Sequence, residues 1–268
     1  ETGWPRGSPD GKRIAYSTQV ETEDGKRGAL FLIGVNQETG EVTEQQKEIE
    51  LQVQAHRTAI AEWSFDNENL VFESVTSPGK HGIFVVGRNG QNFTKIHEFE
   101  SDQIYSGASV SPDFRWVAFI KPAADGFFQL FRVPISGGAE EQLTFDPTDK
   151  TQPSYSPDGK WLVYGSRYND QTGLIARNLS DGEEKWLSYP VQRDDQESPA
   201  ALGVLPAMSF TPDSEKLIAS YGGKFYSIPI SGENAQNIPF SVNEDYELGP
   251  ILKFNYPIID SDKINKKN

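Results

Sequence analysis

Short runs of branched, aromatic and other apolar residues recur along the chain, and each follows a polar turn. Five of them read KRIAYS, ENLVFES, RWVAFI, KWLVYGS and EKLIAS, with apolar positions that alternate or run on without a break. Such side chains suit a pleated surface that is at least half buried, so the pattern predicts short β-strands. The segment EVTEQQKEIELQVQA (41–55) contains helix-forming residues, but its place between a hairpin and the next repeat favours a closing strand.

The turn before each run is one chemical unit that occurs five times. Its copies are GSPDGKRIAYS, WSFDNENLVFES, VSPDFRWVAFI, YSPDGKWLVYGS and FTPDSEKLIASY. Proline presets φ for the first corner of a turn, aspartate accepts hydrogen bonds from the amides that follow it, and glycine adopts a positive φ without steric conflict. We therefore expect a structural role for the repeated aspartates, which are Asp10, Asp66, Asp113, Asp158 and Asp213.

The intervals between these aspartates are 56, 47, 45 and 55 residues. Within each interval a second apolar run ends in a hairpin signal (ETG, RNG, SGG, SDG or SGE), and a closing strand such as EEQLTF or EKWLSY follows. Together with the strand that leads into the turn, each repeat has four antiparallel strands. A four-stranded repeat of about 40 to 50 residues is typical of a β-propeller blade, whose faces are buried against neighbouring blades.

The repeats predict an all-β fold with a single β-propeller domain over residues 1–268. The five expected blades cover about 1–54, 55–101, 102–146, 147–190 and 200–242. Residues 243–268 are expected to form a closing strand or the start of a sixth, incomplete blade.

The repeated SPDGK, with RVPISGG and QLTFDP, resembles the TolB-like, WD40-like propeller repeats of TolB, of tricorn-type proteases and of proteins that carry a prolyl-oligopeptidase domain. This similarity covers nearly the whole chain. In the C-terminal third, YPVQRDDQES and LGPILKFNYPIIDSD look like the propeller region that precedes the barrel of large bacterial amidohydrolases. In such proteins further blades and the barrel would follow, whereas this sequence stops at Asn268.

The resemblance implies a non-catalytic module that acts as scaffold, substrate gate or partner-binding platform of a larger exported hydrolase. The alternative is a free-standing interaction propeller in the periplasm or at the cell surface. In either case the resemblance implies a periplasmic or extracellular location. The partner would be a protein or peptide, or a catalytic domain of the same polypeptide.

Composition narrows the classes of partner. The formal net charge is -14, which argues against nucleic acid and against an anionic membrane surface. The chain has no cysteine and therefore no disulfide or zinc–thiolate site. No stretch approaches the roughly 18 apolar residues of a membrane-spanning helix, so we expect no membrane insertion.

Motifs for catalysis are missing from the sequence. His56, His81 and His97 are isolated from one another, without the His-x-His pair of a metal hydrolase, and we expect them on the surface or in loops. Neither a Gly-x-Ser-x-Gly elbow nor a phosphate-binding glycine loop occurs, so Ser136 and Ser166 are interpreted as turn and strand residues. We expect no catalytic residue, no metal and no cofactor. Any hydrolase activity would reside in a domain that this chain does not contain.

One polar segment is a candidate binding loop. QRDDQES (192–198) lies between two repeats, where long propeller loops gather at the mouth of the channel. Arg193, Asp194, Asp195 and Glu197 are the candidate binding residues, and a solvated loop with internal ion pairs is the alternative.

Two further sets of residues have structural or covalent interpretations. Asn92 and Asn178 stand in Asn-x-Ser/Thr sequons near predicted hairpin ends, where a glycan would fit. Aromatic residues recur on both sides of the repeated turn, and we expect packing between blades rather than a sugar-stacking platform; they are Trp63, Tyr155, Phe210, Phe72, Trp116 and Trp161.

Overall fold

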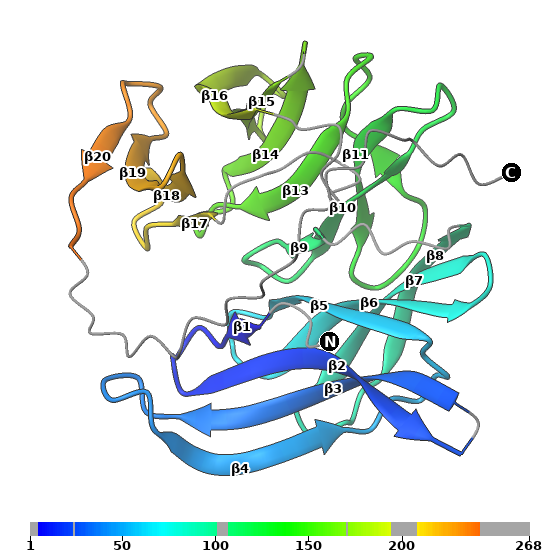
Figure 1. Ribbon diagram of the computed structural model, residues 1–268. Coiled ribbons are helices and arrows are strands. Elements are labelled where there is room, and N and C mark those ends of the chain that lie inside the picture. The colour runs from blue at the N-terminus through cyan, green and yellow to red at the C-terminus, as the bar shows by residue number, and fades with distance from the viewer. Residues whose placement is uncertain (1–4, 24, 101–106, 170, 194–207, 242–268) are drawn as a thin grey trace, which may run out of the picture. The chain divides into compact units, whose positions relative to one another are not determined.

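The computed structural model describes residues 5–23, 25–100, 107–169, 171–193 and 208–241. Their regular secondary structure is entirely β, without a helix among these residues, as Figure 1 shows. All the strands lie in one compact unit, Glu1–Ile238, and the second unit is Pro239–Asn268.

The strands form five sheets of four, and each sheet is antiparallel and follows chain order. Blade 1 is β1 (Arg6–Gly7), β2 (Arg13–Thr22), β3 (Gly25–Val35) and β4 (Val42–Ile49). Blade 2 is β5 (Arg57–Trp63), β6 (Asn69–Ser77), β7 (Lys80–Gly87) and β8 (Thr94–Glu100). Blade 3 is β9 (Ser109–Val110), β10 (Trp116–Pro122), β11 (Phe128–Pro134) and β12 (Glu141–Gln142). Blade 4 is β13 (Lys150–Tyr155), β14 (Trp161–Tyr168), β15 (Gln171–Asn178) and β16 (Glu184–Arg193), and blade 5 is β17 (Met208–Phe210), β18 (Lys216–Tyr221), β19 (Lys224–Pro229) and β20 (Gln236–Ile238).

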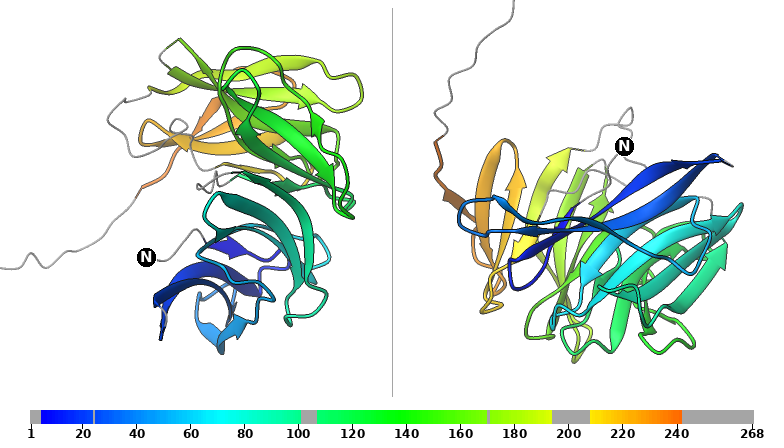
Figure 2. Two further views of the ribbon diagram at one scale, coloured as in Figure 1. Left: turned by 90° about the vertical axis from the view of Figure 1, so that its right-hand side faces the viewer. Right: turned by 90° about the horizontal axis from the view of Figure 1, so that it is seen from below.

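The blades are arranged in a ring, with the first strands of successive blades next to one another (Figures 1 and 2). The predicted all-β propeller of four-stranded blades is confirmed, and its five recognisable repeats are five blades. The segment for which helix and strand competed forms β4, so the strand prediction is correct.

The turn between the first and second strand is closed by the same three hydrogen bonds in every blade. In blade 4, Ser156 Oγ donates to Asp158 Oδ1 at 2.6 Å, and the same carboxylate oxygen accepts from Lys160 N at 3.1 Å. Ser156 Oγ in turn accepts from Trp161 N at 2.9 Å. The equivalent bonds in the other blades involve Asp10, Asp66, Asp113 and Asp213.

Four apolar clusters fill the spaces between successive blades. Trp63, which is 2 % exposed, packs between blades 1 and 2, and Tyr155 packs between blades 3 and 4. The other repeated aromatic residues also belong to these clusters or pack against them, which confirms the predicted packing between blades; they are Phe72, Trp116, Trp161 and Phe210.

Candidate functional site

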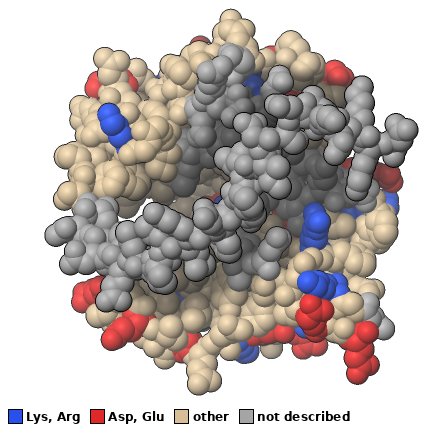
Figure 3. Space-filling model, in the orientation of Figure 1, with Lys and Arg blue, Asp and Glu red and all other residues tan. Residues whose placement is uncertain are grey.

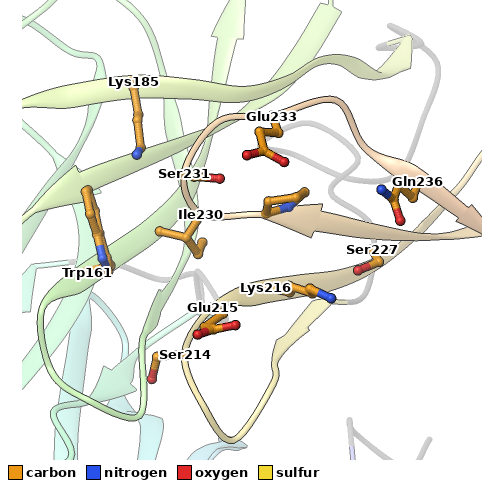
Figure 4. Close-up of a pocket in the computed structure, with 11 residues that line it drawn as sticks. Trp161, Lys185, Ser214, Glu215, Lys216, Ser227, Ile230, Ser231, Glu233 and Gln236 are labelled. Carbon is orange, nitrogen blue, oxygen red and sulfur yellow. The ribbon is translucent and has the colours of Figure 1, made fainter.

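A polar groove of about 540 Å³ lies between blades 4 and 5 (Figure 4). Trp161 at the start of β14 and Lys185 on β16 form the blade 4 wall, and residues from the β17–β18 turn through to β20 form the remainder. Lys185 Nζ lies 4.5 Å from the centroid of the Trp161 ring, within the range of a cation–π contact. This contact joins the outer strand of blade 4 to the aromatic side chain at its second strand.

Charged side chains of both signs face the groove. Glu215 and Lys216 come from the start of β18 and Glu233 from the β19–β20 turn (Figure 4). Within the described part of the chain, neither these three side chains nor that of Lys185 forms an ion pair. The groove therefore offers both donors and acceptors to a polar ligand, which suits the N–H and C=O groups of a polypeptide segment.

The predicted binding loop falls mostly outside the described residues. Arg193 is the last residue of β16, where its backbone pairs with Gln171. Asp194, Asp195 and Glu197 lie outside the described residues. Their role in binding stays a prediction.

The two sequons lie at hairpins. Asn92 is exposed, with a φ of 56°, shortly before β8. Asn178 ends β15, and its Oδ1 accepts from Ser180 N at 2.9 Å while its Nδ2 donates to Asp181 at 3.2 Å. A glycan on Asn178 would be attached to this same Nδ2, which would keep one N–H.

Two of the three histidines are not where the sequence predicted them. His56 is exposed in a loop, as expected. His81 is fully buried on β7, with its Nε2 2.9 Å from Glu73 Oε2, and His97 on β8 lies 2.8 Å from Glu140 Oε2. The surface prediction is wrong for these two because buried or half-buried carboxylates beside them supply the polar partner that burial requires.

Carboxylates of blade 2 form hydrogen bonds across the contact between blades 2 and 3, which we call the acidic seam. Glu62 Oε2 accepts from Ser109 Oγ and Val110 N, both at 2.8 Å. Glu73 Oε1 accepts from the amides of Gly107 and Ala108 at 3.2 and 3.0 Å. Both carboxylates thereby tie the second blade to the first strand of the third.

The pKa values of Glu62 and Glu73 are shifted in opposite directions, although burial alone would raise both. Burial raises the pKa of Glu62, because the hydrogen bonds that it accepts from blade 3 offset only part of the lost hydration. Burial would also raise the pKa of Glu73, but His81 and the two amides outweigh it and leave this pKa below its ordinary value. Glu73 is therefore an ionised, paired group at neutral pH.

A buried lysine beside a serine is a feature that sequence reasoning missed. Lys150 on β13 is 1 % exposed, and its Nζ lies 3.1 Å from Ser166 Oγ and 2.6 Å from Asp146 Oδ2. Burial favours the neutral form of Asp146, yet hydrogen bonds from Lys150 and Thr148 lower the pKa of its carboxyl below the ordinary value. Lys150 Nζ donates to Asp146 Oδ2, to the Thr148 carbonyl oxygen and to Ser166 Oγ, so its hydrogen bonds are made within the fold.

The position of Lys150 explains why no motif announces it. The pair forms because Lys150 and Ser166 lie opposite each other on neighbouring strands, sixteen residues apart in the chain.

Among the described residues, no three histidine, aspartate or glutamate side chains are grouped as metal ligands. No helix of the described chain is long and apolar enough to cross a membrane.

Five four-stranded blades, each closed by a Ser/Thr–Asp turn, define a β-propeller of the repeat type. The family model described as "TolB beta propeller domain" matches residues 3–205. The chain therefore belongs to the TolB β-propeller family.

Solved structures with the same fold come from several bacteria. A putative TolB from Agrobacterium tumefaciens matches with a TM-score of 0.65 and 16 % identity over 88 % of this chain and 80 % of its own. TolB from Acinetobacter baumannii matches with a TM-score of 0.62 and 19 % identity over 91 % of this chain and 55 % of its own. At these identities the similarity shows the fold alone.

A peptidase is similar in sequence. The uncharacterized peptidase YuxL of Bacillus subtilis is 24 % identical over 166 residues, which are 62 % of this chain. The matched region spans only 22 % of that protein. The similarity to propellers that precede an amidohydrolase barrel stays a prediction.

Proposed function

We propose that this chain is a non-catalytic binding module of a larger exported bacterial hydrolase of the amidohydrolase type. It acts there as scaffold, substrate gate or partner-binding platform. The observation that carries the proposal is the polar groove between blades 4 and 5, in which Lys185, Glu215, Lys216 and Glu233 have no ionic partner within the described chain. A charged side chain at the surface is hydrated and needs no ionic partner in the free protein. When a polypeptide binds, such side chains attract its opposite charges and fix its orientation.

The titratable clusters support a non-catalytic role. Lys150, beside Ser166, is buried and paired with Asp146, and His81 lies against Glu73 with no exposed surface. Both groups are held within the fold, whereas a catalytic base must be accessible to the substrate proton that it removes.

The alternative is a free-standing propeller that binds proteins in the periplasm or at the cell surface. It is favoured by the match to the Agrobacterium TolB, because this chain covers 80 % of that protein. Both hypotheses assign partner binding to the propeller, and they differ in whether the partner is part of the same polypeptide.

The length of the native polypeptide separates the two hypotheses. We would detect it in fractionated cells of the source organism with an antibody raised against the purified propeller. A band much larger than 29.9 kDa in the exported fraction supports the hydrolase module, and its peptide map then distinguishes an amidohydrolase barrel from a peptidase domain. A band near 29.9 kDa favours the free-standing alternative, and a cytosolic band contradicts export for either.

The groove itself is tested by reversing its charge. We expect Lys216→Glu to weaken the affinity of the isolated propeller for the remaining domains of that polypeptide, or for the cross-linked partner, by about tenfold. Titration calorimetry measures the change. Lys224→Glu, at the other end of β19 from the groove, is the matched control and should leave the affinity unchanged. Equal affinities for both variants and the parent protein would place the partner elsewhere.

A further inference from the structure

Three exposed aromatic side chains lie together at the outer edge of blade 4. Tyr168 ends β14, and Trp186 and Tyr189 belong to β16; their exposed fractions are 52 %, 44 % and 40 %. The three ring centroids are 5.3, 5.9 and 6.3 Å apart, and the ring planes are inclined to one another by 63° to 72°. We call these three residues the aromatic corner.

The aromatic corner is a built arrangement rather than a chance contact of long side chains. A Cβ at Gly173 would lie 2.4 Å from the Trp186 ring and 2.7 Å from the Tyr189 ring, so only glycine lets both rings approach the backbone of β15. The Tyr189 hydroxyl donates a hydrogen bond to the carbonyl oxygen of Tyr168 at 2.9 Å. Both contacts fix the rings before any ligand arrives, which lowers the entropy lost on binding.

The short outer strand of blade 3 explains why these rings are exposed. Ile175, opposite Trp186 in the ladder, is buried in the cluster between blades 3 and 4, so Trp186 points to the same side. The outer strand of blade 3, β12, has only two residues, whereas β16 has ten. The outer part of this face of blade 4 therefore has no equally long strand opposite it.

The inclination of the rings decides which ligands fit. Rings inclined by more than 60° cannot form the flat platform on which a sugar stacks, but a small rounded group can contact several of them at once. A cation within about 6 Å of a ring centroid is attracted by the ring face. The net charge of -14 also favours a cationic ligand, and Figure 3 shows acidic side chains at several places near the margin of the face in view.

Among the described residues, three carboxylates on the side of blade 4 that faces blade 3 already have partners, which narrows the kind of cation. Glu184 and Asp146, which both interact with Tyr164, are paired with Arg177 and Lys150, each at 2.6 Å. Asp149 Oδ1 accepts from Phe128 N at 2.9 Å. An ammonium or guanidinium group that left water here would need a free acceptor for its N–H donors. A quaternary ammonium group has no N–H donor and therefore needs no acceptor.

We infer that the aromatic corner binds a trimethylammonium group, supplied by a free molecule such as choline or by a phosphocholine headgroup. This inference does not depend on the role proposed for the groove between blades 4 and 5, since no residue of the aromatic corner lines that groove.

The test is an NMR titration of the protein labelled with ¹⁵N in its tryptophan indoles. Choline should move the indole N–H signal of Trp186 saturably, with half-saturation at about millimolar concentration, and leave that of buried Trp63 in place. The uncharged isostere dimethylbutanol should bind about tenfold more weakly if charge contributes to the contact. Vesicles of phosphatidylcholine distinguish a lipid headgroup from the free molecule, and a response to either source supports the inference.

Substitutions separate the site from the fold. Tyr168→Leu should abolish the choline response, whereas Tyr168→Phe, which keeps the ring, should retain it. Gly173→Ala should weaken binding at least tenfold, because the added Cβ displaces two rings. Phe145→Ala, at an aromatic residue that is 72 % exposed and outside the aromatic corner, is the matched control and should have no effect.

Three results would overturn the inference. The first is an unmoved Trp186 signal with both choline and vesicles. The second is an equal response to choline and its uncharged isostere, which would show an apolar patch without cation recognition. The third is a full choline response in Tyr168→Leu with unchanged circular dichroism.

Discussion

The residue that follows each repeated aspartate has a positive φ in all five turns. Glycine occupies this position twice, as Gly11 and Gly159, with φ of 68° and 70°. At Asn67, Phe114 and Ser214 the values are 63°, 55° and 64°, where a side chain makes the left-handed conformation costly. Asn67 Oδ1 accepts from Asp10 N at 2.9 Å, and Ser214 Oγ accepts from Asp158 N at 3.0 Å. Two of these three residues, Asn67 and Ser214, thus bind the turn of the preceding blade.

Ser214 allows the strain and the hydrogen bond to be measured separately. We expect Ser214→Ala to lower the free energy of unfolding by about 1 kcal/mol, because it removes the bond and keeps the strained φ. Ser214→Gly removes the same bond and relieves about 1 kcal/mol of strain, so it should be close to the parent protein. Urea unfolding measures both. A glycine variant less stable than the alanine variant would show that strain at this position is negligible.

Glu62 gives a prediction with a definite pH dependence. Its pKa is raised in the folded protein, so the folded state binds more protons than the unfolded state between the two pKa values. Stability is therefore highest below the unfolded pKa of Glu62 and falls as pH rises through the folded one. We expect Glu62→Gln, measured by urea unfolding, to be about 1 kcal/mol more stable than the parent at pH 7, with no gain near pH 4.

The exposed Glu21→Gln is the control for Glu62, since this carboxylate is 78 % exposed and should change stability little at either pH. If Glu62→Gln destabilises the protein at pH 7, the two hydrogen bonds from blade 3 are worth more to the carboxylate than burial costs it.

At the scale of elements, the acidic seam adds several titratable side chains to its apolar cluster. It holds Glu73 with His81, and His97 and Lys121 with Glu140. Burial lowers the pKa of His97 despite the adjacent Glu140, so this ring tends to be neutral. Lys121 adds a positive charge to the same group, with its Nζ 4.7 Å from the Phe131 ring centroid.

We expect His81→Phe to lower the free energy of unfolding at pH 7 by about 3 kcal/mol, because a buried carboxylate loses its partner. Phenylalanine can keep the stacking on Phe99, whose ring centroid lies 4.6 Å from that of His81. The pKa of Glu73 is depressed, so the stabilisation from this pair is present above the unfolded pKa and is lost as pH falls through the folded pKa. Denaturant unfolding should therefore show a smaller difference near pH 3.

His56→Phe in an exposed loop provides the comparison and should be within 0.5 kcal/mol of the parent, about the usual effect of a surface substitution. A pH-independent loss in His81→Phe would mean that packing, and not the contact with the Glu73 carboxylate, is what the substitution removes.

At the scale of the whole molecule, the features that the sequence predicts are those that repeat along the chain. The strands and turns repeat with fixed local chemistry, so blade structure follows from short segments such as Ser156 to Trp161. The pairs Glu73–His81 and Lys150–Ser166 occur once each and arise from cross-strand register, which no short motif encodes. The aromatic corner could not be predicted for the same reason, because in the sequence its residues look only like strand formers.

The binding loop was predicted from its polar residues and its place in a long segment between blades, and the binding role of Arg193, Asp194, Asp195 and Glu197 stays a prediction. The groove between blades 4 and 5 could not be predicted, because its charged residues come from β16, β18 and the β19–β20 turn. Each of them looks like an ordinary solvated residue within its own segment. Only the packing of two blades brings them to one surface.

The turn network has a consequence for how such a chain evolves. Its three hydrogen bonds all lie within six consecutive residues that begin with a serine or threonine, so each repeat brings its own closed turn. A gene duplication that adds a copy adds a unit that is already satisfied, and only the contacts with its neighbours need to adapt. The position between the hydroxyl and the carboxylate tolerates substitution, as Phe65 in place of the repeated proline illustrates. A fold specified by such short local turns can be kept at low sequence identity, as in the solved structures that share it at 16 % and 19 % identity.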